Sequence, residues 1–175
     1  QHCREHLTNA LEESSAWRHG TPALAGASIS EVMKMKQTYY LAYGSNLNEH
    51  QMRYRCPNAV KVGTLMLDDY QLEFRVFLTI VPHKGAQVPI GVWLVNEEDE
   101  KSLDRYEGYP TFYRKEYIEI EIEDRKEQAL VYIMNDVRKI APPTRQYMYT
   151  CMEGYKNFGF KQKYLLDALD RSIKK

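Results

Sequence analysis

The chain of 175 residues carries 24 Lys and Arg against 24 Asp and Glu, so its formal net charge is zero. This length suits one domain with its own hydrophobic core. The balanced charge argues against nucleic-acid binding through phosphates and against a polybasic membrane-binding surface. No apolar run approaches the roughly 20 residues that span a bilayer, and the N-terminus, with Arg4, Glu12 and Glu13, lacks a signal-peptide layout. We therefore expect a cytoplasmic protein without nucleic-acid or membrane partners.

The cysteines and histidines show no metal-binding or catalytic spacing. Cys3, Cys56 and Cys151 lie far apart, which is typical of free thiols in a reducing compartment. Only His2 and His6 have helical i, i+4 spacing, and they lie in a polar terminal segment that favours no zinc site. We expect neither a metal nor another cofactor. A cysteine hydrolase is disfavoured, because no histidine has a sequence context that suggests pairing with a thiol.

Residues 1–34 differ in pattern from the rest of the chain. Leu7, Leu11 and Trp17 could line one side of a short helix, and residues 19–28 read as a linker. Two interpretations stay open. The segment is either an addition or accessory outside a domain of residues 35–175, or an ordinary N-terminal helix that packs on that domain.

The first clear element is a run of β-branched and aromatic residues at positions 38–43. This run ends at Gly44 and predicts a buried strand. Asn46 or Asn48 can cap the helix that follows, which Pro57 ends. Residues 61–67 and 71–81 predict two strands joined by a turn at the Asp68-Asp69 pair.

The middle of the chain predicts another strand at residues 90–95 and then a helix. Asn96 is the expected N-cap, and the acidic residues 97–99 fill the first turn, where the helix dipole favours negative charge. Gly108 is the expected end of this helix, two residues before Pro110.

The last third of the chain begins with a strict alternation of Ile and Glu at residues 117–123, which predicts a half-buried strand. Residues 130–134 are its expected hairpin partner across a loop at 124–127. Residues 142–144 open a helix that runs to Tyr155. A last helix holds apolar residues at positions 165, 166, 169 and 173.

These elements predict an α+β single domain. We expect a curved, mostly antiparallel mixed sheet or a small barrel, flanked by helices. A doubly wound parallel sheet fits less well, because hairpin connections dominate.

The segment Tyr43-Gly44-Ser45-Asn46-Leu47 lies between a predicted strand and a helix start. Gly44 has no Cβ, so its backbone can approach a ligand closely. The following amides, of residues 45–47, would point outward at the helix N-terminus, where partial positive charge favours a carboxylate. From the residues alone, two interpretations stay open: a ligand-binding loop, or a tight turn with a capping Asn.

Tyr-Gly-Ser-Asn-Leu directly after an apolar strand resembles the signature of the γ-glutamylcyclotransferase family. The similarity continues in order through residues 62–65 with 70–74, 91–93, 103–110, 142–147 and from 154 onward. It covers Thr38 to about Ile173 and leaves residues 1–34 outside. The resemblance implies the α+β fold of that family.

Among the many carboxylates, Glu107 has an unusual setting. It lies at the expected end of a helix, beside Tyr106 and close to Tyr109 and Phe112. The helix dipole and aromatic surroundings would both raise the pKa of its carboxyl, as a general base near neutral pH requires. On these grounds alone a surface glutamate remains the alternative. The resemblance implies that Glu107 is the catalytic acid/base.

The activity that the resemblance implies is an intramolecular cyclisation, of the kind found in glutathione metabolism. The α-amine of a γ-glutamyl group attacks its own γ-carbonyl and releases 5-oxoproline and an amine or amino acid. The nucleophile belongs to the substrate, so no catalytic Ser, Cys or metal is needed. The implied substrate-binding residues are Tyr43, Gly44, Ser45, Asn46, Leu47, Tyr113 and Tyr147.

Two other functions stay open. One is a non-catalytic module that binds a γ-glutamyl or amino-acid-like ligand. The other is a related lyase that acts on another γ-glutamyl-bearing biosynthetic intermediate. The expected partner is in each case a small molecule, and self-association as a homodimer is also left open.

Overall fold

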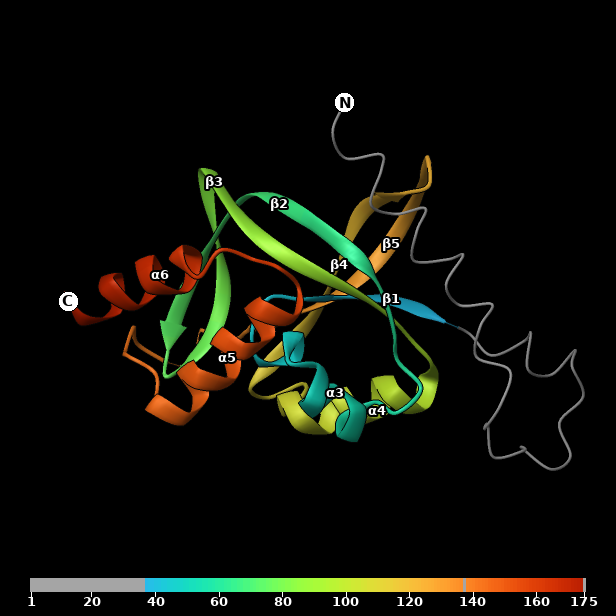
Figure 1. Ribbon diagram of the computed structural model, residues 1–175, viewed down its shortest axis with the longest axis horizontal. Coiled ribbons are helices and arrows are strands. Elements are labelled where there is room, and N and C mark those ends of the chain that lie inside the picture. Colours follow the sequence, from blue (N-terminus) through green and yellow to red (C-terminus); the bar gives the residue numbers. More distant parts are fainter. Residues whose placement is uncertain (1–36, 137, 175) are drawn as a thin grey trace, which may run out of the picture.

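The computed structural model describes residues 37–136 and 138–174 (Figure 1). Our expectations about residues 1–34 therefore lie outside the described residues. The elements in chain order are β1 (Thr38–Ala42), the 3-10 turn η2 (Ser45–Leu47), α3 (Glu49–Arg55), β2 (Val60–Arg75), β3 (Phe77–Val95), α4 (Glu97–Glu107), β4 (Tyr113–Ile122), β5 (Arg125–Met134), α5 (Arg145–Asn157) and α6 (Lys163–Ile173).

The five strands form one mixed sheet in the order β2-β3-β1-β5-β4. Every neighbouring pair is antiparallel except β1 and β5, which run parallel. The expected α+β fold with a mostly antiparallel sheet is confirmed. Within the described residues the sheet is open, with β2 and β4 at its edges, so the small-barrel alternative is wrong.

The predicted turn at Asp68-Asp69 is wrong. The chain runs through this pair as one long strand, and the register with β3 shifts between Asp68 and Tyr70. Asp69 has a φ of 61°, so the local signal for a left-handed residue was real. It produces a β-bulge, which bends and twists a strand without reversing it. The expected strand at 90–95 is part of the longer strand β3. The expected single strand at 71–81 is wrong, because the chain reverses inside it: residues 71–75 end β2 and residues 77–81 begin β3.

The actual reversal lies at Val76, between Arg75 and Phe77, which pair with each other. Val76 has a φ of 71°, which is unfavourable for a β-branched residue. Its amide donates to the Ala141 carbonyl at 3.0 Å. The tertiary structure thus holds a conformation that no local sequence signal indicated.

We expect Val76→Gly to stabilise the protein by about 0.5–1 kcal/mol. Relief of the left-handed conformation contributes about 1–2 kcal/mol, from which the greater unfolded-state freedom of Gly subtracts about 0.5–1 kcal/mol. Urea unfolding would measure the difference. The control is Val60→Gly in the regular backbone of β2, where we expect destabilisation. A destabilised Val76→Gly variant would show that the strain is absent.

The helix limits follow the predicted caps closely. The side chains of Asn48, Asn96 and Thr144 accept hydrogen bonds from backbone amides at the starts of α3, α4 and α5. Gly108 ends α4 with a φ of 63°. The β4–β5 turn is shorter than predicted, because Ile122 pairs with Arg125 and leaves a two-residue loop. Both loop residues have positive φ, as a tight hairpin turn requires.

One helix packs on the edge strand β2, and two others support the turn after β1. Helix α5 contacts η2, α6 contacts β2, and α3 packs against α4 (Figure 1). No helix within the described residues is long and apolar enough to cross a membrane.

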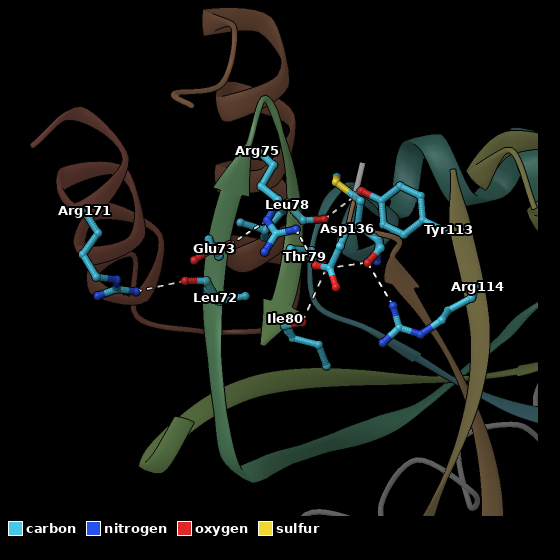
Figure 2. Close-up of polar contacts among 11 residues, drawn as sticks. Leu72, Glu73, Arg75, Leu78, Thr79, Ile80, Tyr113, Arg114, Asp136 and Arg171 are labelled. Carbon is cyan, nitrogen blue, oxygen red and sulfur yellow. Dashed lines mark hydrogen bonds and ion pairs between the residues drawn. The ribbon is translucent and has the colours of Figure 1, made fainter. Parts of the chain in front are cut away.

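Polar contacts fix the start of β3 against the rest of the molecule (Figure 2). The Tyr113 hydroxyl donates to the Leu78 carbonyl at 2.8 Å. The Met134 amide donates to the buried Thr79 hydroxyl at 3.1 Å. At the tip of the β2–β3 hairpin, the Arg75 guanidinium forms an ion pair with Asp136 at 2.9 Å. These contacts hold Leu78 in place as part of a pocket wall.

Candidate active site

A pocket that is partly open to solvent lies where β1, the ends of α4 and β5 and the starts of β3, β4 and α5 meet the loop that leads into η2. Its empty space, including the part open to solvent, is about 630 Å³. Its lining is formed by Tyr40, Tyr43, Gly44, Ser45, Asn46, Phe77, Leu78, Tyr106, Glu107, Phe112, Tyr113, Tyr132 and Tyr147. The lining is mainly aromatic and contains one carboxylate, that of Glu107.

Two glycines allow the loop after β1 to pack tightly through Leu47. The Leu47 side chain is fully buried. A Cβ at Gly91 would lie 2.5 Å from Leu47 Cδ2, and one at Gly154 would lie 2.7 Å from Leu47 Cβ. Such distances are too short for non-bonded carbons. Both glycines are therefore required by the close approach of Leu47 to β3 and α5.

The backbone of the loop leaves two amides without an acceptor among the described residues, those of Ser45 and Asn46. The Leu47 amide donates to the Gly44 carbonyl at 3.0 Å, so it is used within the turn. We expected the amides of residues 45–47 all to point outward, and for Leu47 this expectation is wrong. The Trp93 indole donates to the Asn46 carbonyl at 3.0 Å and anchors the loop on β3.

The Asn46 side chain connects the loop with the carboxylate of Glu107. Its Nδ2 donates to Glu107 Oε1 at 2.8 Å and to the Tyr40 hydroxyl at 2.7 Å. Its Oδ1 accepts from Arg55 Nη1 at 2.6 Å. Loop and acid, 61 positions apart in the sequence, thus form one hydrogen-bonded unit at the pocket.

Burial raises the pKa of the Glu107 carboxyl to about 7. The nearby Arg55 charge and the Asn46 hydrogen bond act in the opposite direction and hold the pKa below what burial alone would give. A carboxyl with this pKa exchanges a proton readily near neutral pH. This agrees with the direction that we inferred from the helix end and the aromatic neighbours.

Three tyrosines of the lining use their hydroxyls to fix the pocket walls. Tyr43 donates to the Tyr132 carbonyl at 2.6 Å, and Tyr113 donates to the Leu78 carbonyl. The Tyr147 hydroxyl accepts from the Leu78 amide at 3.2 Å. Burial raises the pKa of Tyr43, Tyr113 and Tyr147 above the ordinary value, so all three are neutral at pH 7.

All but one of the residues named from the sequence lie in the pocket lining. Leu47 is the exception, because its side chain packs in the core. The sequence interpretation missed Tyr40, Phe77, Leu78 and Tyr132 as lining residues. They come from the three strands β1, β3 and β5. An apolar or aromatic residue in a strand has no sequence signal that separates a pocket from a core position.

The two described cysteines, Cys56 and Cys151, are buried outside the pocket lining. Burial raises the pKa of each thiol to about 12. Neither is a thiolate at neutral pH, which disfavours them further as nucleophiles. In residues 37–136 and 138–174 no three His, Cys, Asp or Glu side chains gather in a way that could hold a metal ion.

Comparisons with known proteins assign the fold and the family. The model of the family described as gamma-glutamyl cyclotransferase, AIG2-like, matches residues 40–153. A gamma-glutamylcyclotransferase of Mus musculus is 31% identical over 140 residues, covering 71% of this chain and 73% of the relative. One of Bos taurus is 29% identical over 142 residues, with the same two coverages.

A solved structure of a gamma-glutamyl cyclotransferase is similar with a TM-score of 0.66 and 25% identity. The similarity covers 76% of this chain and 86% of that chain. The chain therefore belongs to the gamma-glutamyl cyclotransferase, AIG2-like family, which is a family of enzymes. The resemblance found in the sequence is confirmed at the level of the family.

Proposed function

We propose that this enzyme cyclises a γ-glutamyl group and releases 5-oxoproline together with an amine or amino acid, with Glu107 as general acid and base. The observation that carries the proposal is the Glu107 carboxyl, which is hydrogen-bonded by Asn46 at the pocket and has a pKa of about 7. The names of the similar curated proteins support the same chemistry.

The glutamyl part of the substrate fits the loop side of the pocket. The amides of Ser45 and Asn46 have no acceptor among the described residues, and they are suited to the α-carboxylate of the substrate. Tyr43, Tyr113 and Tyr147 enclose the remaining carbon chain. Their rings favour a folded substrate conformation, which brings the amine close to the γ-carbonyl.

The reaction needs one proton carrier and no nucleophile from the protein. Glu107 accepts a proton from the substrate α-ammonium group, and the free amine attacks the γ-carbonyl carbon. The new C–N bond closes a five-membered ring, and the bond to the leaving nitrogen breaks. Glu107 then returns the proton to that nitrogen. The ring nitrogen, which became cationic on attack, gives up its second proton, again through Glu107, to the departing amine, which leaves as an ammonium ion. A carboxyl that titrates near neutral pH serves both steps.

The direct test supplies γ-glutamyl dipeptides and γ-glutamylamines and measures 5-oxoproline. We expect turnover, with a kcat/KM that is constant above about pH 7 and falls tenfold for each pH unit below it. The acid limb arises because only ionised Glu107 accepts the proton, and its pKa is about 7.

Other outcomes separate the remaining functions. Ligand-induced thermal stabilisation without any product would favour a binding module over an enzyme of this kind. Turnover restricted to another γ-glutamyl-bearing intermediate, found by substrate profiling, would favour the related lyase. An acid limb near pH 4.5, the ordinary value for a glutamate, would contradict the assignment of Glu107.

We also propose a cytoplasmic location. The support comes from Cys56 and Cys151, which are free thiols in the structure and are typical of a reducing compartment. Fractionation of cells that produce the natural protein would test this location.

A further inference from the structure

We propose that Arg55, which lies on α3 outside the pocket lining, is a positioning residue that orients the Asn46 carboxamide and through it the Glu107 carboxylate. The inference rests on the proposed role of Glu107. Arg55 belongs to α3. It lies outside both the loop signature at residues 43–47 and the segment around Glu107, so the proposal adds a third element to the site.

The argument starts from the two ends of the Asn46 carboxamide. A guanidinium can only donate hydrogen bonds, so the Asn46 atom that faces Arg55 must be the amide oxygen. This places the amide nitrogen on the other side, where it donates to Glu107 Oε1 and to the Tyr40 hydroxyl. If the amide were reversed, its oxygen would face the Glu107 oxygen, and its NH2 group would face the guanidinium. Both contacts would be repulsive.

Arg55 is itself held from two further sides. Its Nη2 donates to Gln51 Oε1 one helical turn earlier. Its Cζ lies 3.5 Å from the centre of the Tyr106 ring, which is the stacked arrangement typical of Arg on an aromatic ring. Tyr106 directly precedes Glu107 and its hydroxyl lies 3.2 Å from the Ser45 hydroxyl. The guanidinium thus joins α3, the loop and the end of α4.

The charge of Arg55 acts on the same carboxylate. Among the described residues, Arg55 is the charged side chain that shifts the pKa of Glu107, and it lowers that pKa. The other titratable groups coupled to Glu107 are the tyrosines Tyr40, Tyr43, Tyr113 and Tyr147, which burial keeps neutral. Removal of the guanidinium therefore leaves Glu107 both less well oriented and harder to ionise.

The test compares Arg55→Met with Arg55→Lys, which keeps the positive charge. For Arg55→Met we expect kcat/KM at pH 7 to fall roughly 10- to 100-fold, mostly in kcat, and the acid limb to move up by about one pH unit. Arg55→Lys should return the acid limb to near its wild-type position. The matched control is Arg53→Met, since exposed Arg53 lies in the same last turn of α3 and outside this pocket. It should behave like wild type.

A second readout does not depend on turnover. An NMR titration of 13C-carboxyl-labelled glutamate follows Glu107 directly, with its signal assigned by its loss in Glu107→Gln. The Glu107 pKa should rise in Arg55→Met and stay unchanged in Arg53→Met. If Arg55→Met does not fold, Arg55→Gln provides the same charge removal with an amide donor retained.

Three results would overturn the proposal: an unchanged Glu107 titration in the uncharged Arg55 variant, an unchanged acid limb, or equal shifts in the Arg53 control. If wild type releases no 5-oxoproline, the proposed function fails, and the NMR titration still decides the role of Arg55.

Discussion

Replacement of Glu107 by Gln is expected to lower kcat/KM for 5-oxoproline release by about 10²–10⁴-fold, the usual contribution of a general acid/base. Gln keeps an oxygen that can accept from Asn46 Nδ2, so the hydrogen-bonded unit at the pocket remains. What the variant loses is the ability to take up and return a proton. Steady-state kinetics at several pH values would measure the loss and the disappearance of the acid limb.

The same variant should be more stable than wild type at alkaline pH. The folded pKa of Glu107 is raised from 4.5 to about 7, so the carboxyl holds its proton more tightly in the folded than in the unfolded state. Its contribution to stability is therefore fully present below pH 4.5 and is lost as pH rises through about 7. The shift of about 2.5 pH units corresponds to roughly 3 kcal/mol.

Urea unfolding of wild type and Glu107→Gln at pH 5 and pH 8 checks this expectation. The free energy of unfolding of the variant, relative to that of wild type, should be higher at pH 8 than at pH 5. The full change over the titration of Glu107 is up to roughly 3 kcal/mol. The matched control is Glu121→Gln on the exposed face of β4, which should alter neither turnover nor the pH dependence of stability. Full activity in Glu107→Gln would remove Glu107 from the mechanism.

Replacement of Gly154 by Ala is expected to destabilise the protein by roughly 1–3 kcal/mol, the usual cost of overpacking a core. A Cβ there would lie 2.7 Å from the Asn48 backbone nitrogen and 2.8 Å from the Leu47 carbonyl carbon. Backbone atoms cannot move aside as a flexible side chain does. The loop must therefore shift away from α5, and Asn46 moves with it.

Activity should fall together with stability, because a displacement of about 1 Å at a catalytic group can cost about 100-fold in rate. Thermal unfolding and kcat/KM would be measured in parallel. Lys156→Ala, at an exposed position of the same helix, is the control and should be nearly neutral. At an unconstrained helical position Gly→Ala stabilises by about 1 kcal/mol. Such a gain at Gly154 would contradict the tight packing of the loop.

Much of the fold could be predicted from local patterns. The Asn96 cap and Gly108 delimit α4 because capping depends on a few neighbouring groups. The Ile and Glu alternation marks β4 because only one face is buried. The reversal at Val76 could not be predicted, since a β-branched residue at positive φ is imposed by distant contacts such as that with Ala141.

The candidate site also combines features that the sequence predicts with features that it does not. The sequence alone indicates a glycine loop before a helix and a glutamate at a helix end, because both are local features of the chain. That the two form one site was implied by the family resemblance. Only the tertiary structure brings Arg55 and Tyr40 to the Asn46 side chain and buries Glu107 enough to raise its pKa to about 7. Hydrogen bonding and desolvation at this pocket depend on groups from separate elements, and their proximity is decided by packing.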